Sequence, residues 1–346
     1  MLKEKMNVFF RALLIPAAGI LLLILLIFIL SDTPLRAIYF FFIGPFRNLF
    51  NFGNLLNAAV PVILGSLGII IAAKAGRLNL GGEGQIYLGA FITTITALAL
   101  SSFGIKGSVF AAAAGAFASG AIAAFSGFCK AKWNTNELIT TFLFSCALIP
   151  VINFMVTGPF LDPDTSLLST KKIAENMRFA FILKPSSLNA GLFVSLAFVY
   201  IVNFFLNKTK TGYELRMTGS NEIFAGYAGI NIKLNTILVL ALSGFFYGLA
   251  GGIVVLGTHH AVIKEFSAGL GWSGLTAALI ACFNPVAVIP CAIFLAWINS
   301  GARIAMQNTG LTYEIAYIIQ AVIFLLSTSL FAKNIFLNKR KGLNGN

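Results

Sequence analysis

The stretch TILVLALSGFFYGLAGGIVVL, from Thr236 to Leu256, decides the class of fold because its 21 residues include no charge. A helix needs about 20 apolar residues to cross the hydrocarbon core of a bilayer. The whole chain of 346 residues is similar in character, with 58% hydrophobic and 10% charged residues. Soluble domains carry about a quarter charged residues. We therefore predict an all-α fold, a polytopic membrane helix bundle that forms a single transmembrane domain over residues 1–346.

Runs with little or no charge predict about ten transmembrane helices. The first run follows basic residues like a secretory signal, but it is long and lacks an A-x-A cleavage site, so it counts as a span. No charge occurs from Phe266 to Ala302, and Asn284-Pro285 divides this run because proline interrupts a helix. A re-entrant segment in place of the short eighth span would change the count. The predicted spans are residues 12–30, 55–73, 85–101, 108–129, 138–156, 188–206, 236–256, 273–283, 286–302 and 315–331.

Ten spans place both termini on one side of the membrane, and the distribution of basic residues indicates which side. With cytoplasmic termini, fifteen of the 24 Lys and Arg residues fall in inside segments, as the positive-inside rule requires. We therefore predict an extracytoplasmic loop at 158–187 and a cytoplasmic loop at 208–235. The net charge of +13 lies in short segments that flank apolar runs, so we expect the lipid bilayer, and no nucleic acid, as a partner.

Small residues recur at every fourth position in two of the predicted spans. Helices associate in lipid where small residues let their backbones approach closely, so both spans are expected to pack inside the bundle. The positions are Gly115, Ser119, Ala123 and Gly127 in the fourth span and Gly244, Gly248 and Gly252 in the seventh.

No catalytic motif is apparent, and we predict a transport protein without a cofactor of its own. The chain lacks a G-x-x-x-x-G-K-[ST] phosphate loop, an H-E-x-x-H pair and a G-x-S-x-G elbow. A G-x-G-x-x-G pattern at Gly269, Gly271 and Gly274 follows a membrane helix where a dinucleotide site needs a strand. ATP hydrolysis, if the chain depends on it, must therefore take place in another subunit.

Neither the histidines nor the cysteines form a pattern typical of a metal site. His259 and His260 are adjacent and cannot share a helix face, which favours a polar interfacial loop. The four cysteines include no C-x-x-C pair and lie in or beside apolar stretches, which favours buried small side chains over a disulfide.

A glycine-rich motif, Ala75-Gly76-Arg77-Leu78-Asn79-Leu80-Gly81-Gly82-Glu83-Gly84-Gln85, separates the second and third spans. Glycine permits backbone conformations that other residues avoid. Two interpretations of Glu83 stay open: an acid that caps a helix N-terminus, or a functional carboxylate at a substrate path or gate. Polar side chains elsewhere could line the same path or join helices. The candidate path residues are Asn57, Asn79, Glu83, Gln85 and Asn299.

The cytoplasmic loop contains a second motif, from Thr211 to Ile230. Ser220 or Asn221 can cap a short helix that begins near Glu222, and Gly229 can end it. Apolar residues follow at helical spacing, in a helix too short to cross a membrane. Such a helix needs another surface for its apolar side, either the membrane bundle itself or a partner protein.

These motifs together resemble those of a known family. Asn79 to Gln85, Gly219 to Ile230 and Leu242 to Gly252 are similar to the corresponding segments of binding-protein-dependent ABC importer permeases of the sugar, branched-chain amino acid and nucleoside class. The resemblance covers about Asn54 to Phe331. The G-G-E-G-Q form and the length resemble the longer of two paired permeases in nucleoside-type importers. Leu80 stands where isoleucine is usual, and residues 308–313 fit the pattern only loosely.

The resemblance implies a multi-pass permease of a prokaryotic cytoplasmic (inner) membrane that imports a nucleoside-like solute, with riboflavin or a simple sugar as alternatives. Its partners would be a separate ABC ATPase subunit, a second homologous permease and an extracytoplasmic substrate-binding protein, which would approach the loop at 158–187. An ion-coupled secondary transporter is less favoured, because mid-span charges and repeated halves are not evident. The residues implied to couple to the ATPase are Gly212, Glu214, Arg216, Gly219, Asn221, Ala225, Tyr227 and Gly229.

Overall fold

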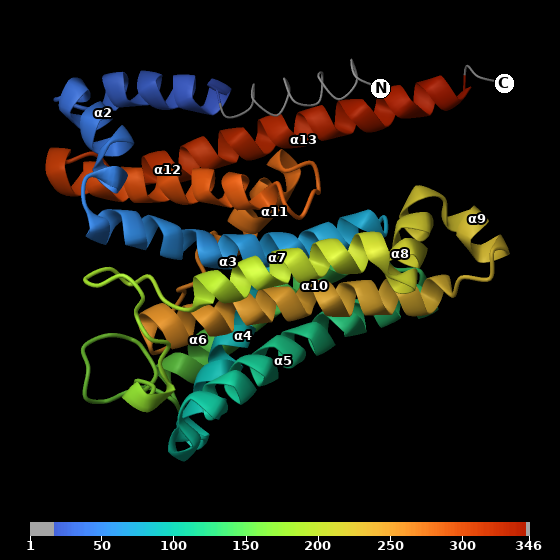
Figure 1. The fold of residues 1–346 in the computed structure, drawn as a ribbon, viewed down its shortest axis with the longest axis horizontal. Coiled ribbons are helices and arrows are strands. Elements are labelled where there is room, and N and C mark those ends of the chain that lie inside the picture. Colours follow the sequence, from blue (N-terminus) through green and yellow to red (C-terminus); the bar gives the residue numbers. More distant parts are fainter. Residues whose placement is uncertain (1–16, 344–346) are drawn as a thin grey trace.

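The computed structural model describes residues 17–343, with side chains as far as residue 328, and this part of the chain consists of helices and loops without a strand. Most of the helices run roughly along one direction and form an elongated bundle (Figure 1). The helices are Ala17–Leu30, α2 (Pro34–Phe42), α3 (Leu49–Lys74), α4 (Gly82–Ala99), α5 (Gly104–Trp133), α6 (Glu137–Thr157), α7 (Gly191–Lys208), α8 (Lys210–Ser220), α9 (Glu222–Tyr227), α10 (Ile232–Val254), α11 (Leu270–Ile280), α12 (Val288–Thr309) and α13 (Glu314–Leu343).

Six helical segments of the described chain are long and apolar enough to cross a membrane. They correspond to six of the ten predicted spans. The other four predicted spans coincide with further apolar helices. Three of these are shorter in their described part, and the fourth, α4, is less apolar. Residues 12–16 and the chain termini lie outside the described residues. The six segments are Leu49–Lys74, Ser101–Trp133, Glu137–Thr157, Gly191–Lys208, Ile232–His259 and Val288–Thr309.

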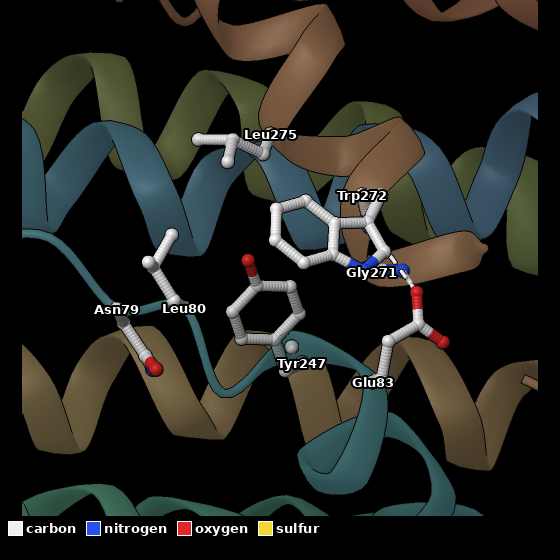
Figure 2. A pocket seen from close by; sticks show the side chains of 8 residues that line it. Asn79, Leu80, Glu83, Tyr247, Gly271, Trp272 and Leu275 are labelled. Carbon is white, nitrogen blue, oxygen red and sulfur yellow. Dashed lines mark hydrogen bonds between the residues drawn. The ribbon is translucent and has the colours of Figure 1, made fainter. Parts of the chain in front are cut away.

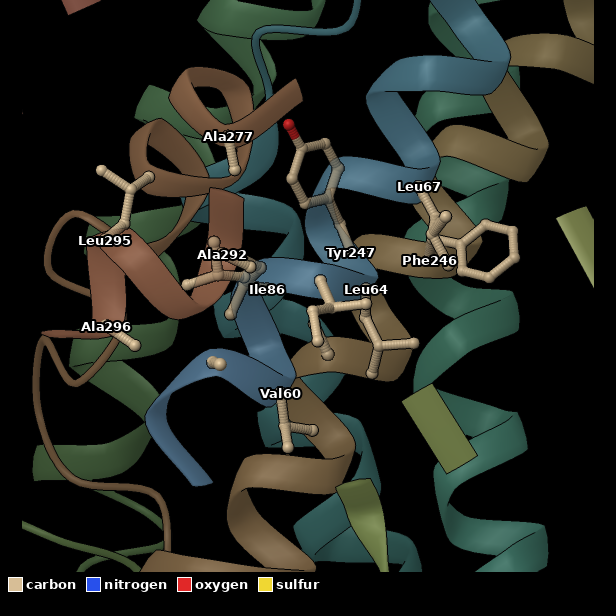
Figure 3. Packing of buried hydrophobic residues seen from close by; sticks show 14 of the residues in the cluster. Val60, Leu64, Leu67, Ile86, Phe246, Tyr247, Ala277, Ala292, Leu295 and Ala296 are labelled. Carbon is tan, nitrogen blue, oxygen red and sulfur yellow. The ribbon is translucent and has the colours of Figure 1, made fainter. Parts of the chain in front are cut away.

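The helices α3 and α10 form the centre of the bundle. The most apolar stretch of α3 is 89% buried and that of α10 72% buried, compared with 22% for α6 at the periphery. Figure 3 shows Leu64 of α3 next to Tyr247 of α10, and Val60 lies one turn away from Leu64 along α3. A helix that is apolar on all sides is typical of such a central position.

The small residues of the fourth and seventh predicted spans, which are α5 and α10, lie where these helices cross each other and α4. This confirms that both spans pack inside the bundle. A Cβ atom added to Gly248 would lie 2.6 Å from the carbonyl oxygen of Gly115, and one added to Gly89 would meet the backbone of Gly248. A Cβ atom on Gly244 would lie 2.5 Å from that of Ala123. These contacts are closer than real Cβ atoms allow, so glycine is required at the crossing.

The two ends of the bundle differ. The helices α8 and α9 lie at one end, here called the α9 end, and the loop at 158–187 lies at the opposite end, here called the loop end (Figure 1). The loop is held to the segment after α10 by backbone hydrogen bonds, including Thr170 N–H to Val262 O at 3.0 Å and Ile173 N–H to His260 O at 2.7 Å. The helix α10 itself ends in a π-helical turn, Val255–His259.

Candidate functional site

The glycine-rich motif enters the interior of the bundle without helical structure. The chain leaves α3 through Gly76, whose φ of 71° favours glycine, and stays non-helical until α4 begins at Gly82. Two of its backbone N–H groups donate hydrogen bonds to side chains of α6, Leu80 N–H to Thr141 Oγ1 at 3.1 Å and Gly84 N–H to Ser145 Oγ at 2.7 Å. Irregular backbone at membrane depth is tolerated only where protein or a water-filled cavity surrounds it.

Two of the predicted path residues, Asn79 and Gln85, bond to each other in this interior. Asn79 and Gln85 are each only 1% exposed. Asn79 Nδ2 donates to Gln85 Oε1 at 2.8 Å and to Ser243 Oγ of α10 at 3.1 Å, while Asn79 Oδ1 accepts from Gly81 N–H at 2.9 Å. The network ties the motif to α10, and a role of these amides in a substrate path stays a prediction.

Glu83 lies at the start of α4 and contacts the N-terminus of another helix. Its Oε1 atom accepts a hydrogen bond from Gly271 N–H at 2.8 Å and one from Trp272 N–H at 3.2 Å, both in the first turn of α11 (Figure 2). Free N–H groups and the helix dipole make such a terminus a binding place for a carboxylate. A small recess adjoins this contact. It is lined by Asn79, Leu80, Gly82, Glu83, Tyr247, Gly271, Trp272 and Leu275.

The remaining predicted path residues lie in separate polar clusters. Asn57 donates to Thr258 Oγ1 at 3.0 Å and accepts from Asn189 Nδ2 at 2.9 Å, where the end of the loop meets α3 and α10. Asn299 of α12 accepts from Tyr313 Oη at 3.2 Å and from Gln320 Nε2 at 2.7 Å. The structure thus groups Asn79, Glu83 and Gln85 but not Asn57 and Asn299.

The loop after α7 forms two short helices where the sequence predicted one. Asn221 caps α9 by accepting from Phe224 N–H at 3.0 Å, as predicted, and Gly229 follows the helix with a φ of 81°. The unpredicted α8 begins with Thr209 as its N-cap, which accepts from Gly212 N–H at 3.1 Å. The sequence of α8 is mostly polar, so it lacks the apolar pattern from which a helix could have been predicted.

The predicted coupling residues divide into buried and exposed positions. Gly212 and Gly219 leave no room for a side chain, because a Cβ atom would meet the backbone of α7 and the carbonyl oxygen of Lys74, respectively. Ala225 is fully buried, whereas Tyr227 is 88% exposed. Two other predicted coupling residues interact with side chains of the same loop or of α7. They are Glu214, which pairs with Lys210 at 3.9 Å, and Arg216, which donates to Asn207 Oδ1 at 3.2 Å.

An apolar surface therefore projects from the α9 end. Ile223, Phe224 and Tyr227 of α9 are 73%, 56% and 88% exposed, and Tyr213 of α8 is 54% exposed. Tyrosine and phenylalanine are enriched in the cores of protein interfaces. We call these four residues the α9 surface.

Sequence reasoning did not single out a group of charges near this surface. Arg77 of the glycine-rich motif, Lys130 of α5, Glu137 of α6 and Glu222 of α9 lie together. Each charge occurs near a helix end, where cations and anions are common. Arg77 and Glu222 lie within the two motifs, but Lys130 and Glu137 lie in neither, so the sequence contains no signal for the whole group.

No metal-ligating group of three or more side chains occurs among the described residues. His259 ends the π-helical turn and His260 follows it in a left-handed conformation. Burial lowers the pKa of His260, and the nearby Arg178 adds to this effect. The four cysteines are free.

Comparison with known proteins agrees with this architecture. The profile of a family described as "Branched-chain amino acid transport system / permease component" matches residues 51–328. The chain belongs to this permease family. It is therefore a transmembrane permease subunit of an ABC transporter and not a catalytic subunit.

Several curated relatives span most of this permease. It is 31% identical to the "Probable riboflavin import permease protein RfuC" of Treponema pallidum, over 89% of this chain and 82% of the relative. It is 29% identical to the guanosine ABC transporter permease protein NupP of Bacillus subtilis, over 87% and 88%, and 26% identical to the nucleoside ABC transporter permease protein NupB of Lactococcus lactis, over 94% and 92%. No solved structure matches the chain.

Proposed function

We propose that this permease imports a nucleoside-like solute and is driven by a separate ABC ATPase that binds the α9 surface. The observation that carries the proposal is the pairing of a buried, polar, non-helical segment with exposed aromatic side chains at one end of the bundle. A buried, polar, non-helical segment is typical of substrate sites near interrupted membrane helices. Exposed aromatic side chains are typical of a docking site for a protein.

The proposed topology has about ten spans with both termini cytoplasmic. The side proposed for the C-terminus is supported by the direction of α13, which runs toward the α9 end (Figure 1). The loop at 158–187 then faces outward, where a substrate-binding protein would dock. The membrane would be the inner membrane of a prokaryote.

The proposed assembly includes a second, homologous permease. Bacillus subtilis has two guanosine permease proteins that are similar to this chain, NupP and NupQ, at 29% and 26% identity. NupP matches over 87% of this chain and NupQ over 70%, which agrees with this chain being the longer member of a pair. The path would lie between the two permeases.

Nucleosides are favoured as substrates because two of the relatives with the broadest coverage carry guanosine or nucleoside in their names. Riboflavin and glucose appear in the names of two others and define the alternatives. The test is to isolate the substrate-binding protein that assembles with this permease and to measure its binding of guanosine, riboflavin and glucose. Binding of riboflavin or of glucose without binding of guanosine would overturn the nucleoside assignment.

A further inference from the structure

The charged group beside α9 joins four separate parts of the fold. Arg77 Nη2 lies 2.8 Å from Glu222 Oε1, the first residue of α9, and Arg77 Nη1 lies 3.7 Å from Glu137 Oε1, in the first turn of α6. Lys130 Nζ of α5 lies 3.4 Å from the other oxygen of Glu137. The two cations and two anions balance, and the Arg77 side chain is only 10% exposed. A buried arginine with two carboxylate partners fixes geometry more firmly than an exposed pair.

A backbone contact reinforces this link. A Cβ atom on Gly76 would lie 3.2 Å from the Cα atom of Gly219, at the end of α8, and one on Gly219 would meet the carbonyl oxygen of Lys74. The end of α8 and the start of α9 therefore rest directly on the turn after α3. Among the described side chains, Arg77 and Glu222 form the only ion pair between α9 and the membrane helices or their turns.

The same segment reaches the interior within a few residues. Thr141 Oγ1 of α6 accepts a hydrogen bond from Leu80 N–H at 3.1 Å, and Glu137 of the same helix pairs with Arg77, so α6 contacts both ends of the non-helical segment. Glu83 then holds the N-terminus of α11 at 2.8 Å. Contacts thus run without a gap from α9 through Arg77 and the buried segment to α11.

We infer that Arg77 is a positioning residue that transmits displacement of α9 to the buried segment 77–83 and to the N-terminus of α11. The inference rests on the proposed function, because it assumes that an ATPase moves α9. Without the guanidinium, α9 stays joined to the bundle by its chain ends, by buried Ala225 and by the backbone contact of Gly219 with Gly76, but the segment follows its movement less closely. Arg77 then acts in coupling rather than in assembly.

The test uses the complete complex of this permease with its second permease, ATPase and binding protein, in lipid nanodiscs. Leu80, half-buried at the recess, is replaced in the Leu80→Cys variant. The rate of maleimide labelling at position 80 is measured by mass spectrometry with and without ATP and vanadate, so no substrate is needed and the native cysteines remain. Nucleotide should change this rate when Arg77 is present.

Arg77→Met should reduce the nucleotide-dependent change about fivefold or more, the low end of ordinary coupling between sites. Glu222→Gln should act similarly, and the Arg77→Met/Glu222→Gln double variant should be no worse than Arg77→Met, because both substitutions remove the same Arg77–Glu222 pair and Arg77→Met alone already removes the Arg77–Glu137 pair. The double variant keeps the Lys130–Glu137 pair and a balanced charge, which protects folding. Arg36→Met, which removes an exposed arginine of α2, is the matched control.

Three outcomes would overturn the inference. The first is a full nucleotide response in Arg77→Met, and the second is single effects that multiply in the double variant. The third is loss of copurified ATPase from the variants, which would make Arg77 a docking residue. If the unmodified complex holds no ATPase, the proposed function itself is wrong. If it holds the ATPase but labelling at position 80 does not respond to nucleotide, the segment does not move and the inference is wrong as well.

Discussion

Replacement of Glu83 separates its two interpretations, the cap of a helix and the carboxylate of a substrate path. In Glu83→Ala the N–H groups of Gly271 and Trp272 both lose their acceptor. A buried donor without a partner costs about 1–3 kcal/mol. This cost applies to Gly271, which is buried, whereas Trp272 is exposed and its bond is longer, at 3.2 Å, so it adds about 1 kcal/mol and the variant should lose about 2–4 kcal/mol.

Glu83→Gln should be milder, because the amide oxygen can still accept both hydrogen bonds. Only the charge is lost, and the difference between a charged and a neutral acceptor is about 1 kcal/mol. Each kcal/mol corresponds to about 2 °C of unfolding temperature in a chain of this size. We therefore expect shifts of about 4–8 °C for Glu83→Ala and about 2 °C for Glu83→Gln.

The assay is thermal unfolding of the purified complex at fixed detergent and protein concentrations. Glu314→Gln is the control, since Glu314 is also an acid in the first turn of a helix but is exposed. It should unfold with the unmodified complex. An unchanged unfolding temperature in Glu83→Ala would refute the capping role, and loss of transport in a thermally intact Glu83→Gln would favour the path.

Three further variants test the packing, the loop anchor and the α9 surface. Gly248→Val should lower the free energy of unfolding by about 1–3 kcal/mol, because its side chain overpacks against Gly115. The control is Ala121→Val on the exposed face of α5, which should unfold like the unmodified complex. Asn189→Ala should cost about 1–3 kcal/mol, because its buried amide bonds to Asn57 and to a backbone oxygen; an unchanged unfolding temperature would exclude this anchor. Tyr227→Ala should leave stability unchanged but reduce copurified ATPase about tenfold or more, and undiminished ATPase would place the docking site elsewhere.

The sequence was sufficient for features with local causes. The charge-free run at 236–256 predicted α10, because crossing a bilayer depends on the apolar length of one segment. The amide of Asn221 predicted the start of α9, because a cap bonds within three residues. Small residues at every fourth position predicted that α5 and α10 both pack inside the bundle, and the structure adds that they pack against each other.

The candidate site depends on contacts that local patterns do not contain. Glu83 lies 188 residues before its partner Gly271, and Arg77 lies 145 residues before Glu222. Glu83 and Glu222 each lie in the first turn of a helix, so the sequence was also compatible with each acid capping its own helix. The depth at which α4 begins was also hidden, since it is set by partners such as Thr141 and Ser145 on α6.

The central claim is that this permease transports only as part of an ATP-driven complex. The most direct measurement is uptake of radiolabelled guanosine, riboflavin and glucose into proteoliposomes that contain this permease alone or with its second permease, ATPase and binding protein. We predict ATP-dependent uptake of guanosine by the complete complex and none by the permease alone, with or without an ion gradient. Uptake by the permease alone under an ion gradient would contradict the account.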